Sequence, residues 1–374
     1  MRPWLIASGD FTTLGGMDRA NHGLARYLAQ TGRPVHLVAH RVADDLMRLP
    51  GLTVHPVPRP FGAHMIGAPL LSRAAVRHAR ALGGSACVLA NGGNARLSGP
   101  TWVHYLHAAH APETIGSART AISARVGRAY YLAQERAALG EASMVICNSE
   151  RTAADVERHY RIDRSRLRVV YYGTDASAFH LPTLAERHSA RTALGLGDRP
   201  AAVFIGALGD RRKGFDLIFD AWCRLSTDPA WDVDLFVVGA GGERDAWVAR
   251  VTDAGLASRM HFLGFRTDVP SVLAAADLLV HPARYEAYGL GVHEAICRGV
   301  PAIVTASAGV AERYPKSLAG LIVPDPPRVE PLISALRAWR ANQTAWAERT
   351  ATFAACLAAR SWDDMAAEIA AAIE

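Results

Sequence analysis

Long hydrophobic runs and paired cysteines are the features that this sequence of 374 residues most clearly lacks. No apolar run approaches the roughly 20 residues that a membrane-spanning helix needs. The apolar run at the start is shorter than the about 7–15 residues of a signal-peptide core, so we expect a buried strand over Trp4–Ser8. The five cysteines are scattered and form no C-x-x-C pair, which favours buried thiols in a reducing compartment over disulfides or zinc ligands.

Internal repeats and compositional bias are also missing, which excludes solenoids, propellers and low-complexity chains. Half of the residues are hydrophobic and a fifth are charged, as in globular proteins, and the length predicts two domains. The formal net charge of +6 suits an anionic partner such as a phosphate, a nucleic acid or a membrane surface. Most of this excess is arginine in an alanine- and arginine-rich chain, so charge alone identifies no partner.

Short apolar runs alternate with amphipathic stretches such as 19–31 and 215–225 along the whole chain. This alternation predicts an α/β fold with parallel sheets covered by helices on both faces. The predicted strands form two series: 4–8, 35–39, 53–57, 87–90, 101–105, 144–147 and 167–171, then 201–205, 234–238, 260–263, 278–280, 302–305 and 320–323.

The break between the two series lies near Phe179–Thr183, where a strand is followed by a proline and a polar helix. We therefore expect a doubly wound N-terminal domain over 1–181 and a doubly wound C-terminal domain over 182–357. The tail is helical with a break at 359–362, where Ser361 is a good N-cap. Its last helix, 358–374, is expected to cross back to the first domain, although packing on its own domain is the alternative.

Two carboxylates lie eight residues apart in the stretch Glu286-Ala-Tyr-Gly-Leu-Gly-Val-His-Glu294. Glu286 follows a strand end, where open α/β sheets bind ligands, and Glu294 lies inside the helix that begins near Gly289. Backbone amides from Tyr288, Gly289 and Leu290 and the helix dipole favour a diphosphate there, and carboxylates accept hydrogen bonds from sugar diols. The alternative is acidic residues that complement the dipole of a helix start, which explains Glu294 poorly.

A second glycine-rich loop, Gly206-Ala-Leu-Gly-Asp-Arg-Arg-Lys-Gly214, follows a strand and precedes a helix. It does not match the P-loop pattern, yet Arg211, Arg212 and Lys213 at a helix start make an anion site. A solvated basic loop is the alternative.

Gly15 and Gly16 join the first strand to the first helix, which allows a phosphate to approach the backbone closely. The surrounding residues fail G-x-G-x-x-G, which weakens a nicotinamide-cofactor interpretation and leaves a tight turn as the alternative.

Three histidines, His104, His107 and His110, follow a strand of the first domain. No cysteine or carboxylate completes a metal site with them. We expect His107 to face a cleft between the domains and to hydrogen-bond sugar or acceptor hydroxyls, with a capping or core histidine as the alternative.

The segment 112–140 interleaves arginines with apolar and aromatic side chains, as a helix lying on an anionic bilayer does. A packed helix with a solvated basic face is the alternative. The residues that carry the pattern are Arg119, Arg125, Arg128 and Arg136, with Ile122, Val126, Tyr130, Tyr131 and Leu132.

Taken in order, these features resemble glycosyltransferase family 4, the retaining enzymes of the GT-B fold, over nearly the whole chain. Glu286 and Glu294 match the E-x7-E motif of that family. Further similarity lies in the run Phe262-Leu-Gly264 to Leu278-Leu-Val-His-Pro282, in the Gly15–Gly16 loop with Leu24–Gly32, and in Tyr172-Gly-Thr-Asp175. Two departures are Ala207, where the family usually has arginine, and Tyr172, where asparagine is more usual.

The resemblance implies two doubly wound domains whose parallel sheets face a cleft. It also implies that Glu286 contacts donor sugar hydroxyls, Glu294 the ribose, and Arg212 and Lys213 the diphosphate, with His107 lining the active site. Arg211 or Arg212 would replace the missing arginine of the 206 loop. Leaving-group charge would be stabilised without a covalent intermediate, and a phosphate oxygen would take the acceptor proton.

The expected function is therefore retaining, metal-independent transfer of a hexosyl-type sugar from a UDP- or GDP-type donor to a glycan, lipid-linked or small-molecule acceptor. No D-x-D pair is placed for a metal, and we expect no cofactor and no nucleic-acid partner. The alternatives are a non-catalytic nucleotide-sugar binding module, a GT-B phosphorylase or epimerase and, more remotely, a Rossmann oxidoreductase. The expected location is the cytoplasm, with peripheral contact to the inner face of the membrane.

Overall fold

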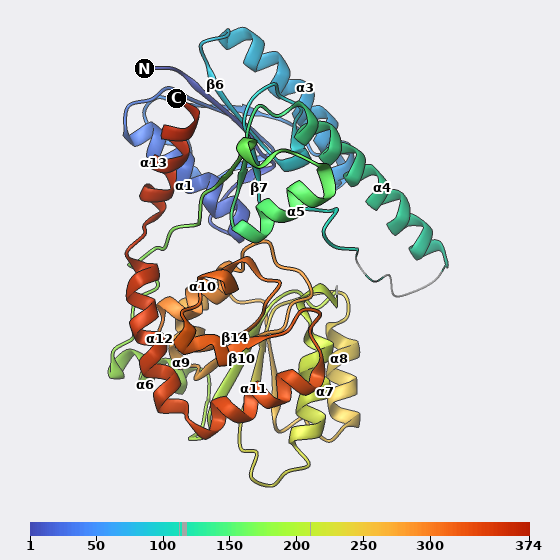
Figure 1. The fold of residues 1–374 in the computed structure, drawn as a ribbon, viewed down its shortest axis with the longest axis vertical. Helices are drawn as coiled ribbons and strands as arrows, with labels where there is room; N and C mark the ends of the chain where they lie inside the picture. The colour runs from blue at the N-terminus through green and yellow to red at the C-terminus, as the bar shows by residue number, and fades with distance from the viewer. Residues whose placement is uncertain (112, 114–117, 210) are drawn as a thin grey trace. The chain divides into compact units, whose positions relative to one another are not determined.

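The computed structural model describes residues 1–111, 113, 118–209 and 211–374, which fold into two compact units. Unit 1 comprises Met1–Gly173 and Arg360–Glu374, and unit 2 comprises Thr174–Ala359. Each unit contains one large parallel sheet and flanking helices (Figure 1), which confirms the predicted α/β class. None of the helices formed by the described residues combines the length and apolarity that crossing a membrane requires.

Unit 1 is built on a seven-stranded sheet of order β5-β3-β1-β6-β7-β8-β9, with every pair parallel. The strand order reverses between β1 and β6: β3 and β5 follow outward from β1 on one side, and β7, β8 and β9 follow outward from β6 on the other. Its strands are β1 (Trp4–Ala7), β3 (Val35–Ala39), β5 (Leu52–Pro56), β6 (Cys87–Asn91), β7 (Thr101–Val103), β8 (Val145–Cys147) and β9 (Leu167–Val169). Its helices are α1 (Gly16–Gln30), α2 (Asp44–Met47), α3 (His64–Leu82), α4 (Ala118–Glu141), α5 (Glu150–Tyr160) and α13 (Trp362–Ile373), with short 3-10 turns η1 (Pro60–Gly62), η2 (Gly92–Asn94) and η3 (Arg164–Arg166).

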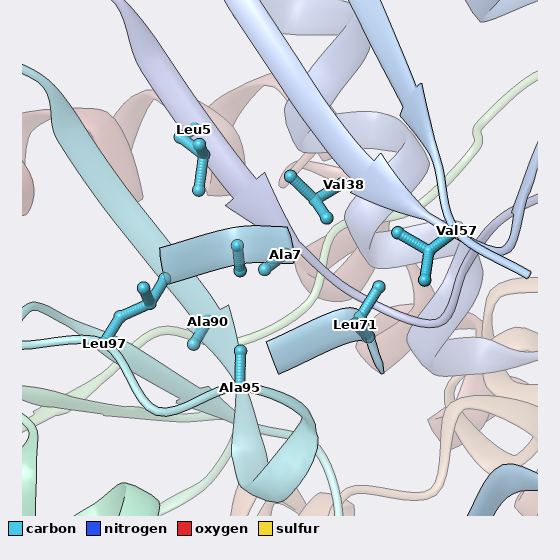
Figure 2. Packing of buried hydrophobic residues seen from close by; sticks show 9 residues of the cluster. Leu5, Ala7, Val38, Val57, Leu71, Ala90, Ala95 and Leu97 are labelled. Carbon is cyan, nitrogen blue, oxygen red and sulfur yellow. The ribbon is translucent and has the colours of Figure 1, made fainter. Parts of the chain in front are cut away.

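One core of unit 1 lies between its sheet and α3. Leu5 of β1, Val38 of β3 and Leu71 of α3 are fully buried there and point toward one another (Figure 2). A sheet that is covered by helices on both faces requires strands that are apolar along their whole length, because neither face is exposed to water.

Unit 2 has a six-stranded parallel sheet of order β12-β11-β10-β13-β14-β15. Its strands are β10 (Ala201–Ile205), β11 (Asp234–Val238), β12 (Met260–Gly264), β13 (Leu278–His281), β14 (Ala302–Thr305) and β15 (Ile322–Val323). Its helices are α6 (Leu184–Ala193), α7 (Phe215–Leu225), α8 (Arg244–Asp253), α9 (Val269–Ala275), α10 (Leu290–Cys297), α11 (Val329–Ala341) and α12 (Gln343–Ala358), with 3-10 turns η4 (Arg211–Lys213), η5 (Gly309–Arg313) and η6 (Lys316–Leu321).

Every predicted strand is present, with ends that differ by at most two residues. The sequence did not reveal β2 (Asp10–Phe11) and β4 (Arg41–Val42), which form a small parallel ribbon beyond β1 and β3. Two-residue strands carry no periodicity, so only their pairing defines them.

Unit 2 begins at Thr174, earlier than the predicted boundary at 181/182. The reason is that residues 174–181 are tied to α10 and its end: Thr174 bonds His293, and Arg298 donates to the carbonyl of His180 at 3.0 Å.

The C-terminal helix α13 packs on α1 in unit 1. Ser361 caps it as predicted, in a capping box with Asp364. Arg26 bonds Asp363 at 2.8 Å, and Arg33 holds Glu374 through two nitrogens at 2.5 and 2.9 Å. The expected return of the last helix to the first domain is therefore observed.

Candidate active site

The strand order of the parallel unit 2 sheet reverses between the central neighbours β10 and β13, from which β11 and β12 follow on one side and β14 and β15 on the other. The loops that leave the carboxyl ends of two such strands diverge and leave room for a ligand. The loop after β10 carries Arg212 and Lys213, and the loop after β13 carries Glu286. The structure thus brings three of the predicted site residues to one topological switch point, although Asp210 in the first loop lies outside the described residues.

Glu286 is surrounded by positive and hydrogen-bonding groups. Its Oε2 pairs with Lys213 Nζ and lies 3.6 Å from Arg212 Nη1. His281, at the end of β13, lies 3.3 Å from the same oxygen through Nε2. The side chains of Glu286, Lys213 and Arg212 are each less than one fifth exposed, so water screens these interactions weakly.

Burial alone would raise the pKa of Glu286, but Lys213, His281 and Arg212 outweigh it and hold this pKa well below its usual range. Burial lowers the pKa of His281, opposed by its hydrogen bond to Glu286. Glu286 is therefore an ionised hydrogen-bond acceptor at neutral pH, with the two cations Lys213 and Arg212 beside it.

Arg284 fixes the turn that carries Arg212 and Lys213, and sequence reasoning missed it. Its guanidinium bonds both carboxylate oxygens of Asp216 at 2.8 and 2.6 Å and the carbonyl of Arg211 at 2.6 Å. Its own backbone N–H donates to the carbonyl of Arg212 at 2.7 Å. Arg284 thus joins the loop that carries Glu286 to the turn that carries Arg212 and Lys213.

Gly214 ends that turn in the left-handed region, with φ of 73°. A Cβ at this position would lie 2.1 Å from the carbonyl oxygen of Pro282. Only glycine therefore allows the two loops to approach closely enough for Lys213 to reach Glu286.

A third loop, Gly239–Gly242 after β11, also packs against the site, and the sequence analysis did not single it out. A Cβ on Gly239 would lie 1.9 Å from the carbonyl oxygen of Gly206, and one on Gly241 would lie 2.1 Å from that of Leu208. Two glycine-rich loops at neighbouring strand ends are therefore in backbone contact. The signal available in the sequence was the glycine cluster after a predicted strand.

Helix α10 begins at Leu290 after Gly289, whose φ is 102°. Glu286 and Tyr288 run beside the 308–310 segment, since Gly309 and Val310 donate to their carbonyls. The N–H groups of Val292 and His293 donate to the carbonyl of Gly289, so the predicted donors Tyr288, Gly289 and Leu290 lie at the start of this helix. Glu294 lies one turn inside α10 and is 7% exposed, which agrees poorly with a merely dipole-complementing surface residue.

The remaining predicted residues lie in unit 1. Gly15 precedes α1 with φ of 84°, and nothing lies within 4 Å of where its Cβ would be. Gly16 is the first residue of α1.

His107, half-buried after β7, stacks on Tyr131 with ring centroids 4.8 Å apart and an interplanar angle of 8°. Burial, together with His64 and Arg128, lowers the pKa of His107 to about 4, so its ring is neutral at pH 7. Buried Glu135 holds this loop by accepting from the backbone N–H of His107 at 2.6 Å and from the Tyr160 hydroxyl.

A polar cluster that the sequence analysis missed lies beside these residues. Asp10 of β2 is paired in register with Arg41 of β4, which bonds its Oδ2 at 2.5 Å, and Arg59 lies 3.5 Å from the same oxygen. Asp18 of α1 is close enough to Asp10 that burial and this neighbouring charge raise the pKa of Asp18 to about 6. His64 connects the cluster to the stack, since its ring lies 5.9 Å from that of Tyr131.

Three acceptor atoms of this cluster are buried without a hydrogen-bond donor among the described residues: Asp10 Oδ1, His40 Nε2 and His64 Nδ1. The other nitrogen of His40 faces the carbonyl of Val57 at 2.9 Å, and that of His64 faces Asn94 Oδ1 at 3.1 Å. Because those oxygens can only accept, the ring nitrogen that faces each of them carries a hydrogen, and the other nitrogen of each ring has no hydrogen-bond partner among the described residues.

Within the described part of the chain, histidine, cysteine, aspartate and glutamate form no group that could hold a metal ion. An Asp-x-Asp sequence does occur, Asp232-Val-Asp234, at the amino end of β11. Asp232 there is bonded twice by Arg340 at 2.6 Å, and Asp234 is bonded by Arg259 at 2.8 Å. These aspartates are at the edge of the sheet opposite to the loops that carry Glu286 and Lys213.

Two family models match the chain. Residues 14–178 match the model described as Glycosyltransferase Family 4, and residues 199–341 match that of Glycosyl transferases group 1. Among curated proteins, the chain is 29% identical over 248 residues to the lipopolysaccharide glucosyltransferase WaaG of Escherichia coli strain K12, covering 64% of this chain and 66% of that protein. It is 37% identical over 169 residues to the lipopolysaccharide core biosynthesis mannosyltransferase LpsB of Rhizobium meliloti, covering 43% of this chain and 44% of that one.

A D-inositol 3-phosphate glycosyltransferase of Salinispora arenicola is 28% identical over 59% of this chain and 52% of its own length. These sequence matches thus span about half to two thirds of the relatives.

Solved structures are matched over nearly the whole chain. Crystalline WaaG superimposes with a TM-score of 0.77 at 22% identity and covers 99% of both chains. A sucrose-phosphate synthase from Thermosynechococcus elongatus gives 0.78 at 20% identity, over 100% of this chain and 98% of its own. The Anabaena protein HepE in complex with UDP and glucose gives 0.69 at 20% identity, over 100% and 99%. The fold is therefore the expected GT-B fold.

Proposed function

Because the chain belongs to glycosyltransferase family 4, we propose that it transfers a hexosyl-type sugar from a nucleoside diphosphate donor to a hydroxyl-bearing acceptor, with retention of anomeric configuration. The observation that carries this proposal is the contact of Glu286 with Lys213, Arg212 and His281 at the switch point of the unit 2 sheet. One fixed carboxylate for sugar hydroxyls beside two cations for phosphates is the arrangement that a sugar diphosphate needs.

In this proposal each group has one task. Glu286 accepts hydrogen bonds from donor sugar hydroxyls, and Glu294 accepts from the ribose. Arg212 and Lys213 hold the diphosphate, with the backbone amides of Tyr288, Gly289 and Leu290 at the start of α10. Because Arg212 lies beside Glu286, we favour Arg212 over Arg211 as the replacement for the arginine that the family usually has at position 207.

The bond between the anomeric carbon and the diphosphate oxygen breaks while the acceptor oxygen bonds that carbon on the same face. A phosphate oxygen of the leaving group takes the acceptor proton, so no protein nucleophile is required. Arg212 and Lys213 stabilise the charge that develops on the diphosphate, which is worth several kcal/mol in a site shielded from water. We propose that no metal takes part, and activity that persists in EDTA is the expected result.

We place the acceptor on the carboxyl edge of the unit 1 sheet, where Gly15, His107 and the Asp10 cluster lie. The side chains of Asp10, His40 and His64 give this edge hydrogen-bonding groups that suit an acceptor rich in hydroxyls. This is consistent with a glycan, a lipid-linked glycan or a small polyol.

Thermal unfolding in the presence of UDP, GDP, ADP and NAD tests the donor assignment. A nucleotide at 100 times its dissociation constant adds about 2.7 kcal/mol to the free energy of unfolding. We expect one nucleoside diphosphate to stabilise the wild type and to lose most of this effect with Glu294→Ala. Stabilisation by NAD alone, or by none of the four, would contradict the proposal.

Turnover separates catalysis from binding. We expect the stabilising nucleotide, supplied as its sugar conjugate, to give nucleoside diphosphate and a glycosylated product of unchanged anomeric configuration. A nucleotide-dependent shift without product over an acceptor panel would instead support the binding module that Ala207 leaves open. Formation of the glycosylated product from a sugar phosphate donor, with release of inorganic phosphate, would support a phosphorylase.

We further propose peripheral contact of α4 with an anionic membrane on the cytoplasmic side. The pattern of arginines interleaved with apolar and aromatic residues spans segment 112–140, of which Pro112 and residues 114–117 lie outside the described residues. In α4, residues 122–126 are all exposed, with Ile122 at 62% and Val126 at 59% beside Arg125. A packed helix would bury one side of this turn. Co-sedimentation with vesicles containing a quarter of anionic lipid, but not with neutral vesicles, is the expected result; equal pelleting with both would contradict it.

A further inference from the structure

A chain of hydrogen bonds crosses the interior of unit 2 behind the Tyr288–Leu290 turn. His293, on α10 and fully buried, contacts the Tyr288 hydroxyl through Nδ1 at 2.7 Å and the Thr174 hydroxyl through Nε2 at 2.6 Å. Thr174 also donates to the carbonyl of Leu357 at 3.2 Å, and Arg313 donates to the Tyr288 hydroxyl at 3.4 Å.

One assignment of hydrogens makes every contact in this chain a hydrogen bond. When the Thr174 hydroxyl hydrogen goes to the carbonyl of Leu357, the Thr174 oxygen accepts from His293 Nε2–H, and the Sγ of Cys297 also lies 3.7 Å from that oxygen. Burial and the nearby Arg313 lower the pKa of His293 to about 3, so the ring is neutral and its Nδ1 carries no hydrogen. Tyr288 must then donate to Nδ1, and its oxygen accepts from Arg313. One tautomer of one histidine therefore satisfies every group in the line.

The two ends of this chain lie at functionally different places. Tyr288 lies two residues after Glu286 and directly before the glycine that opens α10. Thr174 is the first residue of unit 2, and Leu357 lies two residues before its end. His293 thus joins the proposed donor turn to both segments through which the chain enters and leaves this unit.

We propose that His293 is a positioning residue that holds the Tyr288–Leu290 turn and is itself held by Thr174, so that the order of this turn depends on the entry and exit segments of unit 2. Its effect on donor binding rests on the function proposed above, whereas its effect on the turn itself does not. His293 contacts no reacting atom in this scheme and acts through Tyr288.

Two substitutions at His293 each remove one of its two hydrogen bonds and keep the other. In His293→Asn the amide oxygen takes the place of Nδ1, which keeps an acceptor for Tyr288 and removes the bond to Thr174. In His293→Gln the amide nitrogen takes the place of Nε2, which keeps a donor for Thr174 and removes the bond to Tyr288. Thr174→Val breaks the far end without touching the turn. Thr350→Val is the matched control, since Thr350 is a buried threonine of α12 whose hydroxyl donates within the same helix, to the Trp346 carbonyl at 2.8 Å.

Hydrogen exchange of the amides at 287–291, measured without ligand, tests the positioning role directly. We expect about tenfold faster exchange in His293→Asn, His293→Gln and Thr174→Val, and wild-type exchange in Thr350→Val. Calorimetry with the stabilising nucleoside diphosphate should show about tenfold weaker binding in the same three variants. Unchanged exchange in Thr174→Val and His293→Asn, with faster exchange only in His293→Gln, would overturn the proposal, because Tyr288 would then need no support beyond its own bond.

The two measurements allow the positioning role and the transferase assignment to be refuted independently. Exchange that stays at the wild-type rate in all three variants, in a protein that binds its nucleotide, refutes the positioning role and leaves the transferase assignment intact. Exchange that accelerates as expected in a protein that binds no nucleoside diphosphate supports the positioning role and refutes the transferase assignment.

Discussion

Acidification from pH 7 to pH 5 should destabilise this protein because partial or full burial keeps several histidines in their neutral form. Burial lowers the pKa of His104 and of His293 to about 3, and that of His107 to about 4. In the unfolded chain a histidine has a pKa of about 6.5. The unfolded state therefore binds more protons below pH 6.5, and the stability that neutral burial provides is lost as the pH falls from 6.5 toward the folded values.

The magnitude follows from these shifts. At pH 5 each of the three histidines costs about 2 kcal/mol relative to pH 7, since one pKa unit corresponds to about 1.4 kcal/mol. Asp18 acts in the opposite sense, because its pKa is raised to about 6 and the folded state binds its proton first; since Asp18 is partly exposed, water screens this effect and it returns at most about 1 kcal/mol. The net loss is on the order of 5 kcal/mol, a large part of the roughly 5–15 kcal/mol that typically separates a folded protein from its unfolded state.

Chemical denaturation at pH 7, 6 and 5 is the assay, analysed for each unit if two transitions appear. His104→Asn keeps an acceptor for the Tyr172 hydroxyl, which lies 2.5 Å from His104 Nδ1, and removes the titrating ring. We expect it to remove about one third of the pH dependence, whereas His188→Gln, at an exposed position on α6, should leave the pH dependence unchanged. An unfolding free energy that is flat between pH 7 and 5 would refute the assignment of neutral buried rings.

Three further predictions concern the two predicted sites. Glu286→Gln should lower sugar transfer by about 100-fold or more while the nucleoside diphosphate still binds, because Arg212 and Lys213 remain; steady-state kinetics and calorimetry separate the two. Gly214→Ala should lower the free energy of unfolding by more than about 2 kcal/mol, since φ is 73° and the new Cβ would meet the Pro282 carbonyl. As a control, Gly84→Ala, where nothing lies within 4 Å of the new Cβ, should change this free energy by no more than about 0.5 kcal/mol in the same denaturant titration. Glu135→Gln should cost about 1–3 kcal/mol in the same assay, because an amide cannot satisfy both backbone donors and the Tyr160 hydroxyl as the carboxylate does.

The sequence predicted the strands of both sheets because each is a continuous apolar run bounded by glycine, proline or polar residues. It also placed Glu286 on a strand-end loop and the start of α10 near Gly289, since a carboxylate, a glycine turn and a helical run follow one another locally. Features that depend on residues distant in the chain were not visible. Arg284 and its partner Asp216 are 68 residues apart, and their pairing fixes the turn that carries Lys213.

The same reason explains the missed Asp10 cluster. Asp10 and Arg41 lie in strands of two residues, and only the register of the β2–β4 ribbon brings their side chains together. Likewise, the glycines at 239 and 241 gain meaning from carbonyl oxygens of the 206 loop that they approach. Local patterns thus identify where a site lies on a parallel sheet, and pairing between loops determines which side chains complete it.

The pairing of Lys213 with Glu286 raises a question about how one donor engages both. Without ligand, the ammonium and the carboxylate neutralise each other, and each already has its strongest partner. In the proposed function a sugar diphosphate would offer hydroxyl donors to Glu286 and phosphate acceptors to Lys213, and its binding would exchange one ion pair for two sets of charge-assisted hydrogen bonds. A free nucleoside diphosphate satisfies only Lys213 and leaves a buried carboxylate with less compensation. On this argument the ion pair would favour the intact donor over the product that has lost its sugar.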